Sequence, residues 1–102
     1  METIAIDFPA ARAVKGRALA GVVASGDLEV LIEPNAEIRT SVNVTTSVDG
    51  MGHLWRAVLE RMLGDGARPA VKLEINDFGA TPGVVQMRIL QAFEALEQHG
   101  AA

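Results

Sequence analysis

The period at which apolar residues recur separates this chain into strand-like and helix-like segments. Five stretches alternate apolar with polar residues or are rich in β-branched residues, which predicts strands at 2–8, 17–24, 27–33, 38–46 and 70–76. Two further stretches, 51–63 and 82–98, repeat apolar residues at spacings of three and four, which predicts amphipathic helices. The order of element types is therefore β-β-β-β-α-β-α.

Each predicted helix has a single apolar stripe, so each can cover one face of a sheet and leave its charged residues in water. The strand at 70–76 follows a helix, and a right-handed crossover would return it to the same sheet. The order of elements therefore predicts an α+β fold. It consists of a single mixed, mainly antiparallel sheet of about five strands, with two helices packed on one face.

The stretch "VVASGDLEV" contains the turn between the second and third predicted strands. If Ser25 and Gly26 form a two-residue loop, Val23 lies opposite Leu28, and the apolar residues of both strands share one face. A four-residue loop centred on the same point keeps those faces, whereas a slip of one residue would turn the apolar face to solvent. The pattern therefore predicts a hairpin with Ser25 at its tip.

Length and composition favour one domain and disfavour several classes of function. The 102 residues are expected to form a single domain over 1–102, with a frayed tail from about residue 98. The formal charge is −4 and the basic residues are scattered, which disfavours nucleic acid as a partner. No apolar run approaches the ~20 residues of a membrane span, and the first residues lack the basic leader of a secretion signal. We expect a cytoplasmic protein without membrane attachment.

Few residues have the spacing of a catalytic or metal-binding group. There is no cysteine, and His53 and His99 are isolated, so we expect both histidines at the surface and no metal site. Ser25 lacks the glycines of the G-x-S-x-G motif of serine hydrolases, and "DFG" at 77–79 lacks the other motifs of a kinase. The four aromatic residues are widely spaced and are expected in the core: Phe8, Trp55, Phe78 and Phe93.

The stretch "GATPG" at 79–83 leads into the second predicted helix. Thr81 is expected to be the N-cap and Pro82 the first helical residue. The N–H groups of Gly83 and Val84 would then be free to receive a phosphate or a carboxylate. Two interpretations stay open: a capped helix with a flexible entrance, or contact of Thr81 and Gly83 with an anion or a partner.

Three stretches carry a resemblance that extends over nearly the whole chain. They are "GVVASGDLEVLIEP" at 21–34, "VTTSVDG" at 44–50 and "INDFGATPGVV" at 75–85, and they resemble the acyl carrier, or delta, subunit of malonate decarboxylase. Ser25 followed by Asp27 and then by "IEP" is similar to the acyl carrier, or gamma, subunit of citrate lyase.

The resemblance implies a non-catalytic subunit of a bacterial cytoplasmic complex that is modified on Ser25. In this family a serine carries 2′-(5″-phosphoribosyl)-3′-dephospho-CoA through a phosphodiester, and the matching residue is Ser25, with Gly26 and Asp27 as the flanking turn. The group would carry acetyl and malonyl thioesters while malonate is converted to acetate and CO2. The implied partners are the acyl-transferase (alpha) subunit, the decarboxylase (beta/gamma) subunits and the transferase that attaches the group.

Two other interpretations stay open. In the first, the chain is a small α+β protein-interaction or regulatory subunit, and Ser25 is a plain turn residue of a common type. Asp27 and Glu29 suit either docking contacts or ordinary solvated positions on a strand. A stand-alone enzyme ranks third, because the residues show no catalytic constellation.

Overall fold

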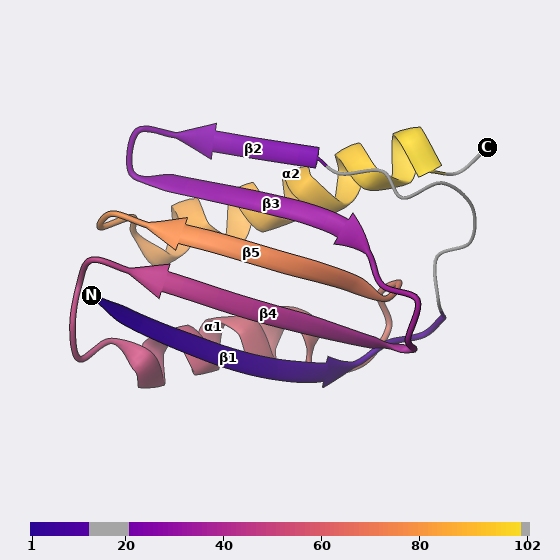
Figure 1. The fold of residues 1–102 in the computed structure, drawn as a ribbon, viewed down its shortest axis with the longest axis horizontal. Coiled ribbons are helices and arrows are strands. Elements are labelled where there is room, and N and C mark those ends of the chain that lie inside the picture. The colour runs from indigo at the N-terminus through magenta and orange to yellow at the C-terminus, as the bar shows by residue number, and fades with distance from the viewer. Residues whose placement is uncertain (13–20, 101–102) are drawn as a thin grey trace.

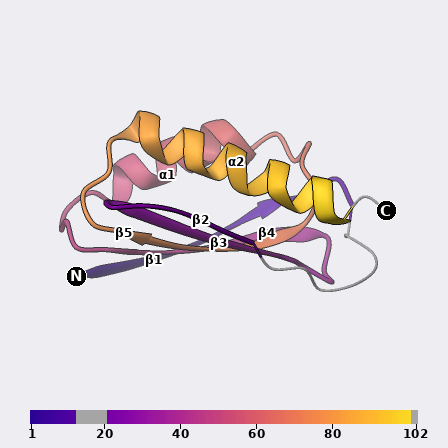
Figure 2. The same ribbon diagram turned by 90° about the horizontal axis from the view of Figure 1, so that it is seen from above.

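The fold consists of one sheet with two helices on the same face (Figure 2). The computed structural model describes residues 1–12 and 21–100, apart from the side chains of 21–25 and 97–100. The elements are β1 (Glu2–Pro9), β2 (Gly21–Ser25), β3 (Leu28–Pro34), β4 (Arg39–Thr46), α1 (Gly52–Leu63), β5 (Val71–Asp77) and α2 (Pro82–Gly100). Both the predicted α+β class and the predicted order of elements are confirmed.

The five strands are arranged in the order β1-β4-β5-β3-β2 (Figure 1). β4 and β5 are parallel, and the other three pairs of neighbours are antiparallel. The parallel pair is joined through α1, which agrees with the crossover predicted from the sequence. The result is a mixed, mainly antiparallel sheet in which β5 is the central strand.

The hydrophobic core lies between the sheet and the helices. β1, β3, β4 and β5 contribute alternate residues to it, because successive side chains of a strand point to opposite faces. On β5, for example, Val71, Leu73 and Ile75 are buried. The helices contribute residues at spacings of three and four: Trp55, Leu59 and Leu63 from α1, and Val85, Ile89, Phe93 and Leu96 from α2.

The β2–β3 hairpin differs in register from the predicted one. Its two-residue turn is Gly26–Asp27, so Ser25 is the last residue of β2 and lies opposite Leu28. Val23 lies opposite Val30, and not opposite Leu28 as predicted. A shift by two residues preserves the alternation of faces, so the apolar pattern determines which residues share a face without determining which residues pair.

Ile38 and Phe78, which the sequence predicts on an apolar face or in the core, are exposed. Ile38 is 65% exposed, because β4 begins one residue later, at Arg39. Phe78 is 60% exposed, because it follows Asp77, the last residue of β5. The other three aromatic residues are buried as predicted. Residues 17–20 of the second predicted strand lie outside the described residues.

Candidate functional site

One row of paired residues crosses the sheet at the end where β2, β4 and β5 finish. From β2 to β1, the row consists of Ser25, Leu28, Asp77, Thr46 and Glu2. Its three central members are buried. The β2–β3 turn, the β5–α2 loop and the β4–α1 loop therefore lie at the same end of the molecule, on the left in Figure 1.

The turn beside Ser25 is open to solvent. Gly26 is exposed, and no atom lies within 4 Å of the position that a Cβ atom would take there. The Asp27 carbonyl oxygen accepts a 2.9 Å hydrogen bond from the N–H of Phe78, which fixes the turn to the end of β5. Gly26 and Asp27 thus form the turn that flanks Ser25, and the Cβ position of Gly26 is open.

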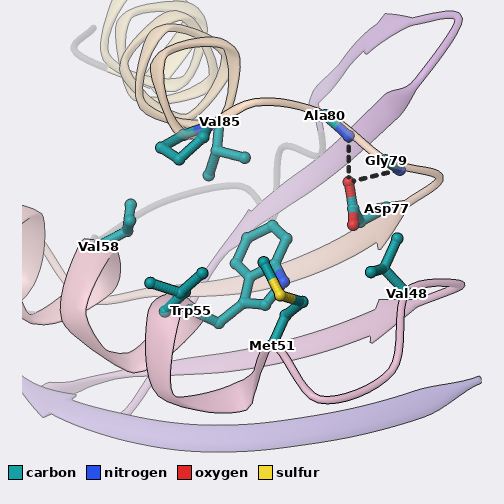
Figure 3. A pocket seen from close by; sticks show the side chains of 10 residues that line it. Val48, Met51, Trp55, Val58, Asp77, Gly79, Ala80 and Val85 are labelled. Atoms are coloured by element: carbon teal, nitrogen blue, oxygen red, sulfur yellow. Dashed lines mark hydrogen bonds between the residues drawn. The ribbon is translucent and has the colours of Figure 1, made fainter.

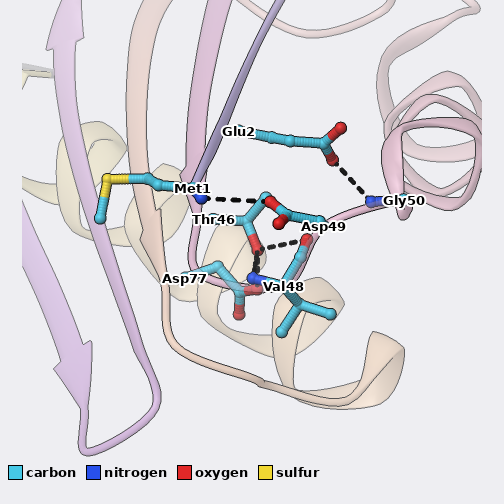
Figure 4. A network of polar contacts seen from close by, with 7 residues as sticks. All are labelled: Met1, Glu2, Thr46, Val48, Asp49, Gly50 and Asp77. Atoms are coloured by element: carbon cyan, nitrogen blue, oxygen red, sulfur yellow. Dashed lines mark hydrogen bonds and ion pairs between the residues drawn. The ribbon is translucent and has the colours of Figure 1, made fainter.

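Asp77 organises the loop between β5 and α2. Its Oδ2 accepts a 2.8 Å hydrogen bond from the Thr46 hydroxyl, in the network of Figure 4. Its Oδ1 accepts hydrogen bonds from the N–H groups of Gly79 (3.2 Å) and Ala80 (2.9 Å). Gly79 has a φ of 109°, a backbone conformation that favours glycine. The "DFG" stretch at 77–79 therefore forms a turn. Its buried carboxylate, Asp77, is the hydrogen-bond acceptor, and its glycine, Gly79, adopts a left-handed backbone conformation.

The β4–α1 loop is fixed by the first residues of the chain. The Glu2 carboxylate accepts a 3.0 Å hydrogen bond from the N–H of Gly50, and the N-terminal ammonium of Met1 lies 3.1 Å from the Asp49 carboxylate (Figure 4). The N–H of Val48 donates a 3.0 Å hydrogen bond to the Thr46 hydroxyl oxygen. These contacts join the loop to the start of β1 and to the end of β4.

The start of α2 has the predicted cap. Thr81 Oγ1 accepts a 3.4 Å hydrogen bond from the N–H of Val84, and α2 begins at Pro82. The N–H groups of Gly83 and Val84 were both predicted to be free to bind an anion. That of Val84 already donates a hydrogen bond to Thr81. Gly83 is exposed, with no atom within 4 Å of the position of a Cβ atom.

The open surroundings of Gly83 lead to a prediction about stability. A Gly83→Ala variant is expected to be more stable by about 0.5–1 kcal/mol, because alanine favours helix and meets no neighbouring atom at this position. Urea unfolding followed by far-UV circular dichroism measures the difference. A loss of stability would contradict the open surroundings of Gly83.

A cavity of about 170 Å³ opens between the two helices at this end of the sheet (Figure 3). Its lining comes from α1, from α2, from both loops and from the end of β5: Val48, Met51, Leu54, Trp55, Val58, Asp77, Gly79, Ala80, Pro82 and Val85. Sequence reasoning did not find this cavity. Met51, Trp55 and Val85 have helical spacings typical of core residues, and the space between them depends on how the two helices pack in three dimensions.

Histidine and carboxylate side chains do not converge in the described part of the chain. No group of three or more metal-ligating residues occurs there. His53 is exposed, as predicted, and the side chain of His99 lies outside the described residues. Among the described helices, none combines the length and apolar character needed to cross a bilayer.

Comparison with known proteins identifies the family. The sequence model of the malonate decarboxylase delta subunit (MdcD) matches residues 15–96, which include Ser25. This chain belongs to that family. The malonate decarboxylase acyl carrier proteins of Pseudomonas savastanoi pv. phaseolicola and Pseudomonas aeruginosa are both 51% identical to it. These two alignments cover 94% and 92% of this chain, and 97% and 95% of the respective relatives.

The fold of this family member also occurs in a solved structure. One chain of the crystal structure of a Pseudomonas malonate decarboxylase hetero-tetramer in complex with malonate superposes with a TM-score of 0.81. The two chains are 42% identical, and the match covers 94% of this chain and 99% of that one. The resemblance to the delta subunit of malonate decarboxylase is thereby confirmed.

Proposed function

We propose that this chain is the acyl carrier subunit of a malonate decarboxylase and that Ser25 carries its prosthetic group. Membership of the malonate decarboxylase delta-subunit family supports this function most directly, since the matched residues 15–96 include Ser25. The group proposed is 2′-(5″-phosphoribosyl)-3′-dephospho-CoA, joined to the Ser25 hydroxyl by a phosphodiester. When bound, it supplies a thiol on which acetyl and malonyl groups are held as thioesters.

The surroundings of Ser25 fit such a group. The adjoining Gly26 is exposed, and its Cβ position is free of neighbours, so a large adduct on the preceding residue has room to leave the surface. The turn is fixed through Asp27 to the end of β5, which gives the attached group a stable base. A tether on a stable base raises the local concentration of its free end at nearby active sites.

In this proposal the chain itself is not a catalyst. Asp77 is the buried carboxylate at this end of the sheet, and its oxygens already accept three hydrogen bonds. The chemistry of converting malonate to acetate and CO2 is assigned to partner subunits, an acyl-transferase (alpha) and decarboxylases (beta/gamma). A separate transferase attaches the group. The hetero-tetramer that contains the crystallised relative supports an assembly of this type.

Mass spectrometry tests the proposal directly. Protein that is isolated from its native host, or produced together with the enzymes that make and attach the group, should carry one adduct of the mass of phosphoribosyl-dephospho-CoA. The adduct should map to the peptide that contains Ser25. Chain produced without those enzymes is the control and should have the unmodified mass. Unmodified protein in the presence of the enzymes would contradict the assignment.

Thr81 and Gly83 are proposed to contact the phosphates of the group or a partner that handles it. A Gly83→Trp variant is then expected to slow attachment of the group to Ser25 at least about fivefold, equivalent to about 1 kcal/mol of binding free energy. The Gly83→Ala variant is the matched control and should keep the wild-type rate. Equal rates for the wild type and both Gly83 variants would contradict this contact and leave Thr81 only its role as the cap of α2.

A further inference from the structure

The cavity between α1 and α2 begins in the same row of residues as Ser25. Ser25 is paired with Leu28, and Leu28 with Asp77, which lines the cavity. Two interstrand spacings, roughly 10 Å, therefore separate Ser25 from the edge of the cavity. The proposed group contains two ribose units, a pyrophosphate and pantetheine between its phosphodiester and its thiol, so its thiol end has ample length to reach the cavity.

The cavity suits an uncharged ligand. Met51, which precedes α1, and Trp55 of α1 face Val85 of α2 across it (Figure 3). Asp77 is the only ionisable residue among the ten described residues of the lining, which include neither lysine nor arginine. The Asp77 carboxylate already accepts hydrogen bonds from the loop N–H groups of Gly79 and Ala80. A second carboxylate placed there would lose its hydration and meet a like charge.

The size of the cavity points to the short end of an acyl thioester. An apolar protein cavity of about 150 Å³ accommodates benzene, and this one measures about 170 Å³. An acetyl group, the sulfur and the two methylene groups beyond it contain as many non-hydrogen atoms as benzene. A malonyl group has the same linkage but adds a carboxylate, for which the lining offers no cation.

We propose that this cavity binds the acetyl thioester end of the arm on Ser25 and excludes the malonyl form. This inference rests on the function proposed above and assigns a role in it to the residues of the cavity. They would shelter the acetyl thioester from water between turnovers. The malonyl thioester would stay in solvent, where a decarboxylase subunit can take it up.

Two leucines of almost equal exposure provide a matched test. Leu54 lines the cavity and is 40% exposed, whereas Leu90 of α2 is 39% exposed and lies outside the lining. Substitutions of these two residues should be equally compatible with folding. Trp55 is the only tryptophan of the chain and lines the cavity, so its fluorescence reports on occupancy.

The unmodified chain is titrated with S-acetylpantetheine and with S-malonylpantetheine, and Trp55 emission is recorded. Wild-type protein should bind the acetyl compound with a dissociation constant on the order of millimolar and at least about fivefold more tightly than the malonyl compound. Leu54→Glu should weaken acetyl binding several-fold, and Leu54→Lys should raise malonyl binding relative to acetyl binding. Leu90→Glu and Leu90→Lys should behave as wild type.

The rate of thioester hydrolysis in the chain that carries the acylated group provides a second measurement. Hydrolysis adds water to the acyl carbon, breaks the carbon–sulfur bond and releases acetate and the free thiol. The acetyl thioester at the end of the group attached to Ser25 should hydrolyse several-fold more slowly than free S-acetylpantetheine, and Leu54→Glu should remove this protection. The malonyl thioester should be unprotected in all variants.

The outcomes separate this inference from the proposed function. Equal affinity of the unmodified chain for both compounds, or equal effects at Leu54 and Leu90, would overturn the role of the cavity while leaving the mass of the Ser25 adduct as an independent result. Selective acetyl binding that depends on Leu54 would support the cavity site even if Ser25 were found to carry no group. The missing group would then count only against the proposed attachment.

Discussion

A Ser25→Ala variant is expected to lose the covalent adduct completely and to lower malonate decarboxylation by the assembled complex at least about a hundredfold. Without the hydroxyl there is no attachment point, and an untethered carrier group would lose the effective concentration that a tether provides. The variant should fold normally, because Ser25 ends an edge strand beside an exposed turn. Intact-mass spectrometry and the rate of CO2 release measure the two effects.

Ser47 is the matched control for this experiment. It follows β4 at the same end of the sheet and is exposed, so Ser47→Ala should keep both the adduct and the activity. Decarboxylation within a few-fold of wild type by the Ser25→Ala variant would contradict the carrier function. That result would favour the other interpretation, in which the chain is an interaction or regulatory subunit and Ser25 is a turn residue.

An Asp77→Ala variant is expected to lose about 3 kcal/mol of unfolding free energy. The substitution removes the acceptor of three hydrogen bonds and leaves the Thr46 hydroxyl and the N–H groups of Gly79 and Ala80 without it. Asp77 is only 4% exposed, so water cannot readily replace the carboxylate. Urea unfolding monitored by Trp55 fluorescence gives the difference.

Asp65 provides the comparison for Asp77. Its carboxylate also accepts a hydrogen bond from a loop N–H, that of Ala67 at 3.0 Å, but it is exposed. Asp65→Ala should therefore change the stability by less than about 0.5 kcal/mol. Similar losses for both variants would show that burial of the Asp77 network contributes little to the fold.

The types of element were predictable because the apolar period is a local property of the sequence. The pairing of the strands was less predictable from the sequence. Shifting the β2–β3 hairpin by two residues preserves its faces, so the turn at Gly26–Asp27 and the predicted turn at Ser25–Gly26 satisfy the same pattern. Strand order depends on which helix covers which strands, and this information is absent from the alternation within any one strand.

The candidate site was predictable only in part. Turn chemistry placed Ser25 near a hairpin tip, while its proposed role came from the family resemblance. The cap formed by Thr81 followed from local rules and is confirmed. The exposed position of Phe78 and the acceptor role of Asp77 depend on where β5 ends, and the cavity depends on the packing of two helices that are far apart in sequence.

The central place of β5 determines when the site is complete during synthesis. Among the described strands, β1 pairs only with β4 and β2 only with β3, so neither of these pairs uses hydrogen bonds to β5 at its outer strand. β5, at residues 71–77, joins the two pairs, and Asp77 then connects the Ser25 row across the sheet. A nascent chain that ends before β5 contains the serine but lacks the folded surface around it. The transferase proposed to attach the group to Ser25 would meet this surface only in chains whose β5 has been made and paired.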